Sequence, residues 1–279
     1  MASVEGTINY ISKFPDIKSK VLGKTGYHAS ICGFGSYRID DGIHQHKLAL
    51  EKAVLSGINV IDTSSNYSDG GSEILIGKVL NNLIDQNQIL RDEIILVSKG
   101  GYLQGTNLKQ AMHREQTGKA FKDIVKCSPD LWHCISPDFL ENQISLSLER
   151  LKLDKIDVYL LHNPEYFLTY SVIFDPERRE REYYRRIKDA FIFLESEVSK
   201  GRISYYGISS NTFAEQQSKQ NFTSLEKIIA IANEISENNH FAVVQFPMNI
   251  IEAGGMINLN QQNQTKTFLQ FAGENNIGV

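Results

Sequence analysis

The chain has 279 residues, of which 41% are hydrophobic and 22% charged, and its formal net charge at pH 7 is −4. This length suits one large α/β barrel or two ordinary domains of a globular protein. The charge excludes the strong basicity typical of proteins that bind nucleic acid or acidic membranes. Cys32, Cys127 and Cys134 are too few for a disulfide framework. With no apolar run long enough to cross a bilayer and no leader-like start, we expect a cytoplasmic protein without membrane or nucleic-acid partners.

Short apolar segments rich in β-branched and aromatic residues recur along the chain and predict strands buried on both faces. They cover residues 30–35, 58–64, 93–99, 156–162, 204–210, 241–248 and 276–279. Segments with helical periodicity separate several of these strands. They cover residues 44–56, a stretch from Ser136, residues around 187–198 and a stretch from Thr223. This alternation predicts a parallel sheet with helices outside it, in one domain because no linker interrupts the pattern.

Two spans break the alternation, residues 100–136 and 163–182. Each follows the carboxyl end of a predicted strand, the side on which barrel active sites form. Connections this long are usually either functional or disordered. Basic residues in the first span are interleaved with acidic ones, which indicates a solvated surface or, alternatively, a lid over an anionic substrate. They are Lys109, Arg114, Lys119, Lys122 and Lys126.

Polar side chains end three successive predicted strands, namely Asp62, Lys99 and His162, and Tyr67 follows Asp62 after a short polar stretch. Alone, a strand-end lysine usually extends to solvent and a lone histidine is usually structural. In a closed parallel barrel, however, these positions converge at one mouth. A carboxylate beside apolar strand residues is costly without a partner, so we expect Asp62 to pair with Lys99.

These four side chains are suited to donating a proton. A free tyrosine has a pKa of about 10, and a nearby lysine cation lowers such a pKa by roughly 1–3 units. We therefore expect Lys99 to lower the pKa of Tyr67, Asp62 to keep Lys99 charged and aimed, and His162 to orient a carbonyl oxygen. The set predicts protonation of an oxygen while a hydride arrives at its carbon.

Other motifs do not fit their consensus. The sequence GKT at residues 23–25 lacks the upstream glycine of a P-loop, and GFGSYR lacks the third glycine of a dinucleotide-binding fingerprint. Cys127, His133 and Cys134 have no recognised metal-ligand spacing, so we predict no metal site.

Several segments resemble the aldo-keto reductase superfamily in order and spacing, over residues from about 21 to the end. They are VLGKTGYHASICGFGSYR, GINVIDTSSNYSDGGSEILIGKVL, IILVSKGG, IDVYLLHNPE, KGRISYYGISSN and VVQFPMN. The combination of HCISP with LLHNPE is similar to a long-loop branch of that superfamily. The resemblance implies an α/β TIM-type (β/α)8 barrel over residues 21–279, preceded by an extension over residues 1–20. It also implies reduction of a carbonyl, or the reverse reaction, with NADPH and less often NADH.

The resemblance assigns roles to single residues. Asp62, Tyr67, Lys99 and His162 match the catalytic tetrad, with Tyr67 as the general acid. Cofactor-binding positions lie near the nicotinamide and its carboxamide, and Asp62 shares this role. The other matching residues are Ser36, Tyr37, Ser209 and Gln245, together with either Ser210 or Asn211. The usual Ser-Asn pair is replaced here by Ser-Ser-Asn, which leaves Ser210 and Asn211 as alternatives.

The sequence ends at Val279, within what the resemblance makes the seventh strand. About seven strands of the barrel are therefore expected, without the segment that binds the pyrophosphate and 2′-phosphate. A small-molecule carbonyl or alcohol is the expected substrate, and the oligomeric state is not readable. One alternative is a non-catalytic binding or regulatory subunit, or an inactive fragment. Another is a lyase that uses Lys99 as a Schiff-base amine, which the neighbouring carboxylate disfavours.

Overall fold

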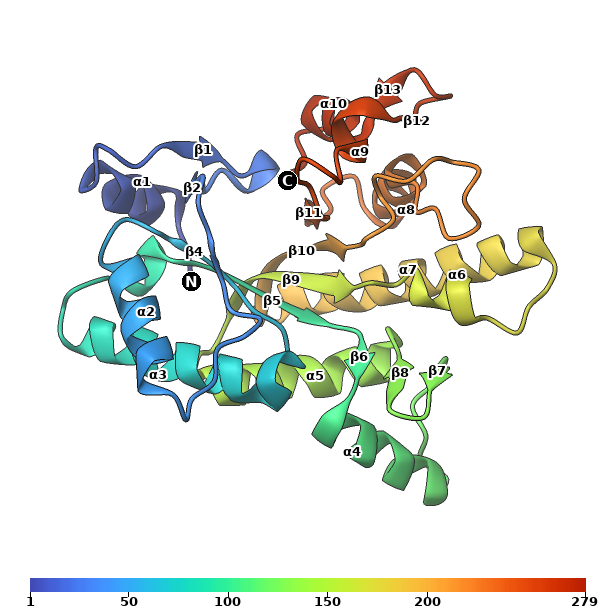
Figure 1. Cartoon of the computed structure of the whole chain (residues 1–279), viewed down its shortest axis with the longest axis horizontal. Helices are drawn as coiled ribbons and strands as arrows, with labels where there is room; N and C mark the ends of the chain where they lie inside the picture. Colours follow the sequence, from blue (N-terminus) through green and yellow to red (C-terminus); the bar gives the residue numbers. More distant parts are fainter.

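A parallel sheet organises the computed structural model, which describes all 279 residues (Figure 1). Its six strands follow one another in chain order across the sheet, from β3 at one edge to β11 at the other. They are β3 (Phe34–Gly35), β4 (Val60–Asp62), β5 (Ile95–Gly100), β9 (Ile156–His162), β10 (Ile203–Ser209) and β11 (Phe241–Gln245). A parallel bridge between Val243 and Gly278 adds one more paired position beyond β11. The predicted α/β barrel class is confirmed, with sequential parallel strands and helical crossovers.

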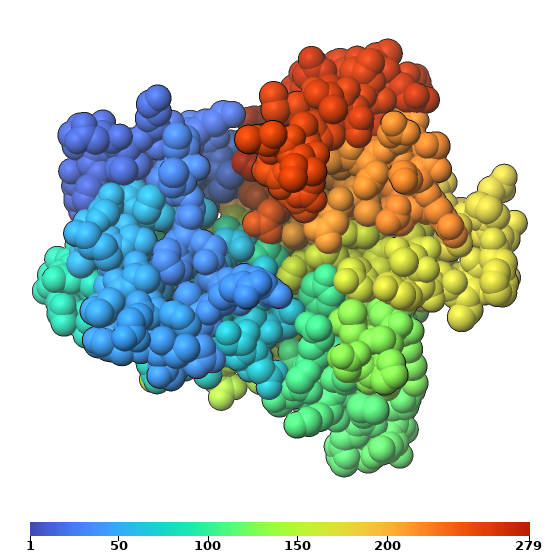
Figure 2. Space-filling view, in the orientation of Figure 1, coloured from blue at the N-terminus to red at the C-terminus, as the bar shows by residue number.

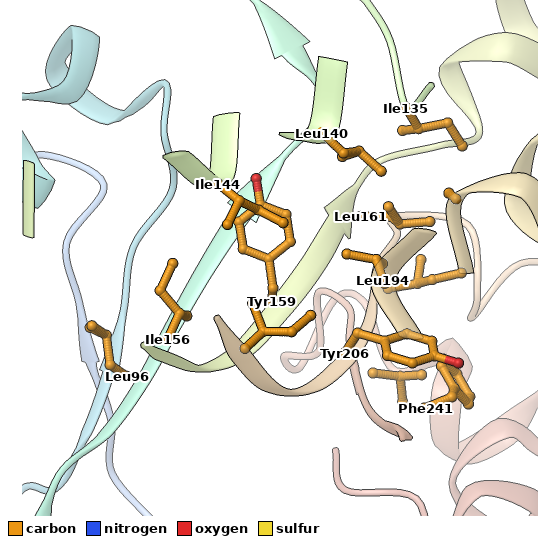
Figure 3. Packing of buried hydrophobic residues seen from close by; sticks show 14 of the residues in the cluster. Leu96, Ile135, Leu140, Ile144, Ile156, Tyr159, Leu161, Leu194, Tyr206 and Phe241 are labelled. Carbon is orange, nitrogen blue, oxygen red and sulfur yellow. The ribbon is translucent and has the colours of Figure 1, made fainter. Parts of the chain in front are cut away.

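Helices cover the outer face of the sheet because each carries an apolar stripe that is buried against it. They are α2 (His44–Val54), α3 (Gly71–Asp85), α5 (Pro137–Leu151), α7 (Pro176–Ser199), α8 (Leu225–Ile235) and α10 (Phe268–Glu274). The main core, a cluster of 48 buried residues, lies between sheet and helices. Figure 3 shows Tyr159 of β9 against Leu140 and Ile144 of α5, and Tyr206 beside Phe241. Helix α3 was not predicted as a helix, although its buried Leu75, Ile76, Val79, Leu80 and Leu83 have helical spacing.

A second, smaller apolar cluster fills the inner face of the sheet and includes Val97, Leu160 and Val243. An antiparallel hairpin, β1 (Ser19–Val21) and β2 (His28–Ser30), covers its amino-terminal end. The single strand expected over residues 30–35 was therefore wrong. The chain pairs in the hairpin up to Ser30 and then bends, with the Ser30 hydroxyl bonded to the carbonyl of Cys32, before it enters the sheet as β3.

Helix α1 (Val4–Ser12) precedes the hairpin and is docked on the main core. Its Tyr10 is buried and donates to the backbone carbonyl of Val54. The amide of Ala2 donates to the Asp157 carboxylate over 2.5 Å. The short helix η1 (Gly23–Thr25) lies against the end of the chain, because the Lys24 amide donates to the carbonyl of Asn276 over 2.8 Å. Figure 2 shows these amino-terminal and carboxy-terminal segments side by side.

The long span after β5 is structured rather than disordered. It contains β6 (Tyr102–Leu103), α4 (Gly105–Gln116), β7 (Val125–Ser128) and β8 (Leu131–His133), and the three strands form an antiparallel sheet in the order β6-β8-β7. Helix α6 (Tyr166–Tyr170) lies in the second span, before α7. Figure 1 shows both excursions extending from the ends of β5 and β9.

The remaining elements are short, and they follow β4, α3 and β11. They are η2 (Tyr67–Gly70), η3 (Arg91–Glu93), α9 (Gly254–Ile257), β12 (Leu259–Gln261) and β13 (Lys266–Thr267). No helix in the structure has both the length and the apolar character required to span a membrane.

Candidate active site

The sheet register aligns polar residues along its carboxyl edge. Gly35 pairs with Asp62, and Ser209 pairs with both His162 and Gln245. Beyond β4, the backbone keeps bonding to β5, because the Thr63 amide donates to the Val97 carbonyl and the Ser65 amide to that of Lys99. These bonds fix the start of the loop that carries Tyr67, and the four predicted catalytic side chains thus lie at one edge.

Lys99 joins two of the other three side chains. Its Nζ lies 2.8 Å from the Asp62 carboxylate and 3.2 Å from the Tyr67 hydroxyl. The third donor position is taken by the Thr63 carbonyl at 2.9 Å. An ammonium group has three N–H donors, so these three acceptors satisfy all of them. This accounts for a fully buried lysine, and it confirms the expected pairing of Asp62 with Lys99.

The expected net lowering of the Tyr67 pKa was wrong. Burial, the Asp62 carboxylate and the nearby Tyr37 raise the pKa of Tyr67 above its ordinary value. Burial also lowers the pKa of Lys99, although Asp62 opposes that shift. Desolvation is the largest cause of the Tyr67 shift, and the Asp62 carboxylate acts in the same direction because it disfavours a second negative charge nearby. Tyr67 therefore stays protonated at neutral pH, and it gives up its proton only to an oxygen atom that becomes strongly basic within hydrogen-bonding distance.

His162 is held neutral in an aromatic environment. Burial lowers its pKa well below the ordinary value, and the Lys99 cation adds to this. Its Nδ1 lies 3.0 Å from the Ser64 hydroxyl, and its ring is edge-on to that of Tyr102 at 4.6 Å between centroids. Its carbonyl bonds Nε2 of His133 at 2.7 Å. Gly101 permits this approach, because a Cβ there would overlap the His162 carbonyl.

The residues expected to bind a cofactor occupy two kinds of position. Gln245 bridges the site, since its amide donates to Asp62 over 3.1 Å and its oxygen accepts from Ser209 over 3.0 Å. Tyr37 is exposed and packs edge-on to Tyr67 at 5.1 Å between ring centroids. Asn211 lies on the wall of the site cavity.

The other two expected cofactor residues point away from that cavity. The Ser36 hydroxyl is fully buried and accepts from Ser72 over 2.7 Å. The Ser210 hydroxyl lies 3.1 Å from that of Thr212, also in the interior. Of the two alternatives Ser210 and Asn211, only Asn211 has its side chain on the cavity.

A cavity of about 820 Å³ opens above Tyr67. Aromatic side chains form much of its wall, and polar side chains form its rim. Its lining residues are Tyr37, Arg38, Asn66, Tyr67, Ser68, Asp69, Tyr102, Gln104, Gly105, Leu131, His162, Tyr166 and Asn211. None of the five basic residues considered for a lid is among them. The cavity can hold a compound of the size of a small substrate together with part of a cofactor.

Several residues that shape this cavity were not predicted from the sequence. Tyr102 and Tyr166 form part of its wall, and the buried His133 supports that wall by stacking on Tyr166 at 5.6 Å between centroids. Glu165 is buried beside it, accepts from the Asn163 side chain and from the Asn211 amide, and has its pKa raised by burial. The signal for Glu165 was its place three residues after His162 in LLHNPE, where the chain turns out of β9.

The sequence profile of the aldo/keto reductase family matches residues 33–279. The chain belongs to the aldo/keto reductase family. It is 28% identical over 224 residues to a 6-dehydroglucose reductase of Novosphingobium aromaticivorans, a match that covers 77% of this chain and 58% of that protein. It is 27% identical over 154 residues to an NADH-specific methylglyoxal reductase of Escherichia coli, covering 52% of this chain and 42% of that protein.

Solved structures of aldo-keto reductases share the fold. The holo form of one from Bacillus halodurans superposes with a TM-score of 0.58 at 21% identity, over 94% of this chain and 64% of that one. The chain spans about half the length of these two curated reductases.

Proposed function

We propose that this chain carries the catalytic half-site of a nicotinamide-dependent oxidoreductase that reduces an aldehyde or ketone to an alcohol, or catalyses the reverse. The observation that supports this most strongly is the hydrogen-bonded cluster of Asp62, Lys99 and Tyr67 beneath a cavity. A proton donor backed by a buried cation at the base of a substrate-sized cavity is the arrangement that carbonyl protonation requires.

The cofactor we propose is NADPH, with NADH as the alternative, and either would supply the hydride. The Asn211 side chain lies on the cavity and offers both a donor and an acceptor to a carboxamide. Ser209 and Gln245 would hold the same end from the neighbouring strand edge. Tyr37 is exposed beside Tyr67, and the face of its ring that Arg38 does not cover gives a planar ring a surface on which to stack. The residues present thus fit the nicotinamide end of such a cofactor.

In this mechanism Tyr67 donates its proton to the carbonyl oxygen as negative charge develops there. Lys99, 3.2 Å from the hydroxyl, then stabilises the phenolate that is left. Asp62 keeps the ammonium charged and in place. The single Ser64 hydroxyl proton has three acceptors within reach, namely Asn66 Oδ1 at 2.7 Å, Nδ1 of His162 at 3.0 Å and the Lys99 carbonyl at 3.2 Å. In the tautomer in which Ser64 donates to Nδ1, Nε2 of His162 carries the ring proton and can orient the substrate carbonyl oxygen.

The decisive experiment is Tyr67→Phe. We expect it to lower the turnover of NADPH-dependent aldehyde reduction by at least ~100-fold, because general acid catalysis of this kind contributes about 10²–10⁴. Quenching of NADPH fluorescence on binding should change little, since the ring stays. Tyr170→Phe on α6 is the matched control and should behave as the unmodified chain. Substantial turnover by a folded Tyr67→Phe protein would exclude Tyr67 as the acid.

A further inference from the structure

Two charged side chains, Asp69 and Arg38, line the cavity. Asp69 has hydrogen-bond partners within the protein, and Arg38 has none. Asp69 is engaged at the start of α4: it accepts from the Thr106 amide over 3.0 Å and from the Thr106 hydroxyl over 2.5 Å. The partial positive charge at a helix N-terminus offsets such a carboxylate further. Arg38 makes no hydrogen bond or ion pair with any residue of the chain, and it lines the same cavity.

Arg38 is held at the cavity by a contact that leaves its donors free. Its guanidinium carbon lies 5.5 Å from the centroid of the Tyr37 ring. A cation–π contact at an exposed site contributes only about 0.5–1 kcal/mol and uses none of the five N–H groups. A guanidinium with free N–H groups in a planar fork matches the oxygens of a carboxylate or a phosphate.

The other titratable groups at the cavity carry no unpaired negative charge that would repel an anionic ligand. His162 is neutral, and the Lys99 cation behind Tyr67 is paired with Asp62. Gln104 uses its oxygen to accept from the Asn66 side chain over 3.0 Å, which leaves its own amide N–H groups as donors. The rim therefore presents unused donors and one unpaired positive charge.

The Arg38 guanidinium lies close enough to the Tyr67 hydroxyl for one small molecule to reach both groups. Arg38 lies on Tyr37, and the Tyr37 ring packs edge-on to Tyr67 at 5.1 Å between centroids. A compound with its carbonyl at the Tyr67 hydroxyl and an anionic group a few carbons away can reach Arg38 across the Tyr37 ring. The arginines of the second cavity, at the start of α7, are not part of this wall.

We propose that the substrates are small carbonyl compounds that carry a carboxylate or a phosphate, and that Arg38 binds this anionic group. The carbonyl end of this inference rests on the proposed function. The anion contact does not, because it requires only binding in the cavity.

Two matched pairs of aldehydes test whether the anionic group of the ligand contributes to binding. Succinic semialdehyde is compared with butanal, and glyceraldehyde 3-phosphate with glyceraldehyde. Affinity is measured on the 279-residue chain by ligand-observed NMR, and turnover with NADPH is measured on the same samples. The variants are Arg38→Gln, Arg38→Lys, which keeps the charge, and Arg181→Gln, which removes an exposed arginine from α7.

We expect the charged member of at least one pair to bind ~10-fold more tightly than its neutral partner, as a charge-assisted hydrogen bond at a solvent-exposed site would give. Arg38→Gln should abolish this preference, Arg38→Lys should retain part of it, and Arg181→Gln should leave it unchanged. Which pair shows the preference decides between carboxylate and phosphate.

Equal affinity for charged and neutral probes, or a preference that survives Arg38→Gln in a folded protein, would overturn the inference even if turnover occurs. Arg38-dependent binding of the charged probe without any turnover would uphold the anion site and count against the proposed function. Rising salt should weaken the preference, since an exposed ionic contact is screened.

Discussion

Lys99 is a fully buried cation whose three N–H groups all have acceptors inside the protein. Taking an ammonium group out of water costs several kcal/mol, and only close opposite charge and complete hydrogen bonding offset that cost. Asp62 supplies the charge and Thr63 the carbonyl, so Lys99 has a single orientation. The Tyr67 hydroxyl therefore meets a fixed positive charge, and no rearrangement is needed when the phenol loses its proton.

Among single residues, His133 should make stability depend on pH in acid solution. Burial lowers its pKa from 6.5 to about 4. The unfolded chain takes up this proton as the pH falls below 6.5, whereas the folded chain resists it until about pH 4. The free energy of unfolding should thus fall between these values, by about 3 kcal/mol in total. His133→Gln keeps a donor for the His162 carbonyl and should flatten this part of the curve.

The measurement is urea denaturation between about pH 4 and 7, the range in which the neutral and charged forms of histidine exchange. His113→Gln, which changes an exposed side chain of α4, is the control and should retain the slope of the unmodified protein. The pKa of His162 is also lowered by burial, so His162 adds to the same dependence of unfolding free energy on pH. His133→Gln should therefore reduce this dependence without abolishing it. An unchanged slope in His133→Gln would show that His133 is not buried in the neutral form.

At this scale the sequence predicted which four side chains meet, because strand ends and register are local properties. It did not predict the direction of the Tyr67 pKa shift, which follows from the burial of the phenol and its closeness to Asp62. It also did not identify Glu165 or the aromatic residues Tyr102 and Tyr166. Their places depend on how two long excursions fold back over the site, which periodicity does not encode.

Among the elements, α4 shows how an excursion is tied to the site. Its N-cap residue, Gln104, makes no capping bond with its side chain. Instead, the Thr106 amide donates to Asp69, which lies 37 residues before Thr106 and just after Tyr67. A second link joins Asn66 to Gln104. The loop of the proposed acid and the first turn of α4 thus hold each other in place.

Asp69→Ala should loosen this junction. We expect a loss of about 1 kcal/mol in the free energy of unfolding, the usual cost of removing a cap. Amide hydrogen exchange, followed by mass spectrometry, should become faster in the first turn of α4. Asp41→Ala, which removes a half-buried carboxylate that pairs with Lys78, is the control. Equal exchange in both variants would mean that Asp69 does not support α4.

Element prediction succeeded where one residue pattern covers the whole element, as in β9, β10, α5 and α8. It failed for elements that are very short and for elements that depend on contacts with distant parts of the chain. β3 has two residues, and α4 has its cap supplied from another loop. Ser68 and Asp69 adopt positive φ angles of 49° and 52° within η2, a conformation that no neighbouring sequence signal demands.

For the whole molecule, α1 is the clearest case of a segment whose position was not predictable. Residues 1–20 have no barrel pattern and were interpreted as an extension. In the structure Tyr10 reaches the carbonyl of Val54, and Ser3 donates to both the backbone carbonyl and the carboxylate of Asp92. These partners lie far along the chain, so no local rule connects them to α1.

Tyr10→Ala should therefore destabilise the whole protein by about 3–5 kcal/mol, as large-to-small changes of buried aromatic residues do. Ile8→Ala on the same helix removes a side chain that is 43% exposed, and it should cost much less. Thermal and urea unfolding of the two variants tests this. Similar small losses in both would show that α1 is not part of the folded core.

The contact between Ala2 and Asp157 spans 155 residues. During synthesis Ala2 leaves the ribosome long before its partner exists. At roughly 5–20 residues per second, that wait is on the order of 10–30 seconds. Helix α1 can therefore dock fully only after β9 has emerged. The order in which this molecule is assembled thus differs from the order in which it is translated.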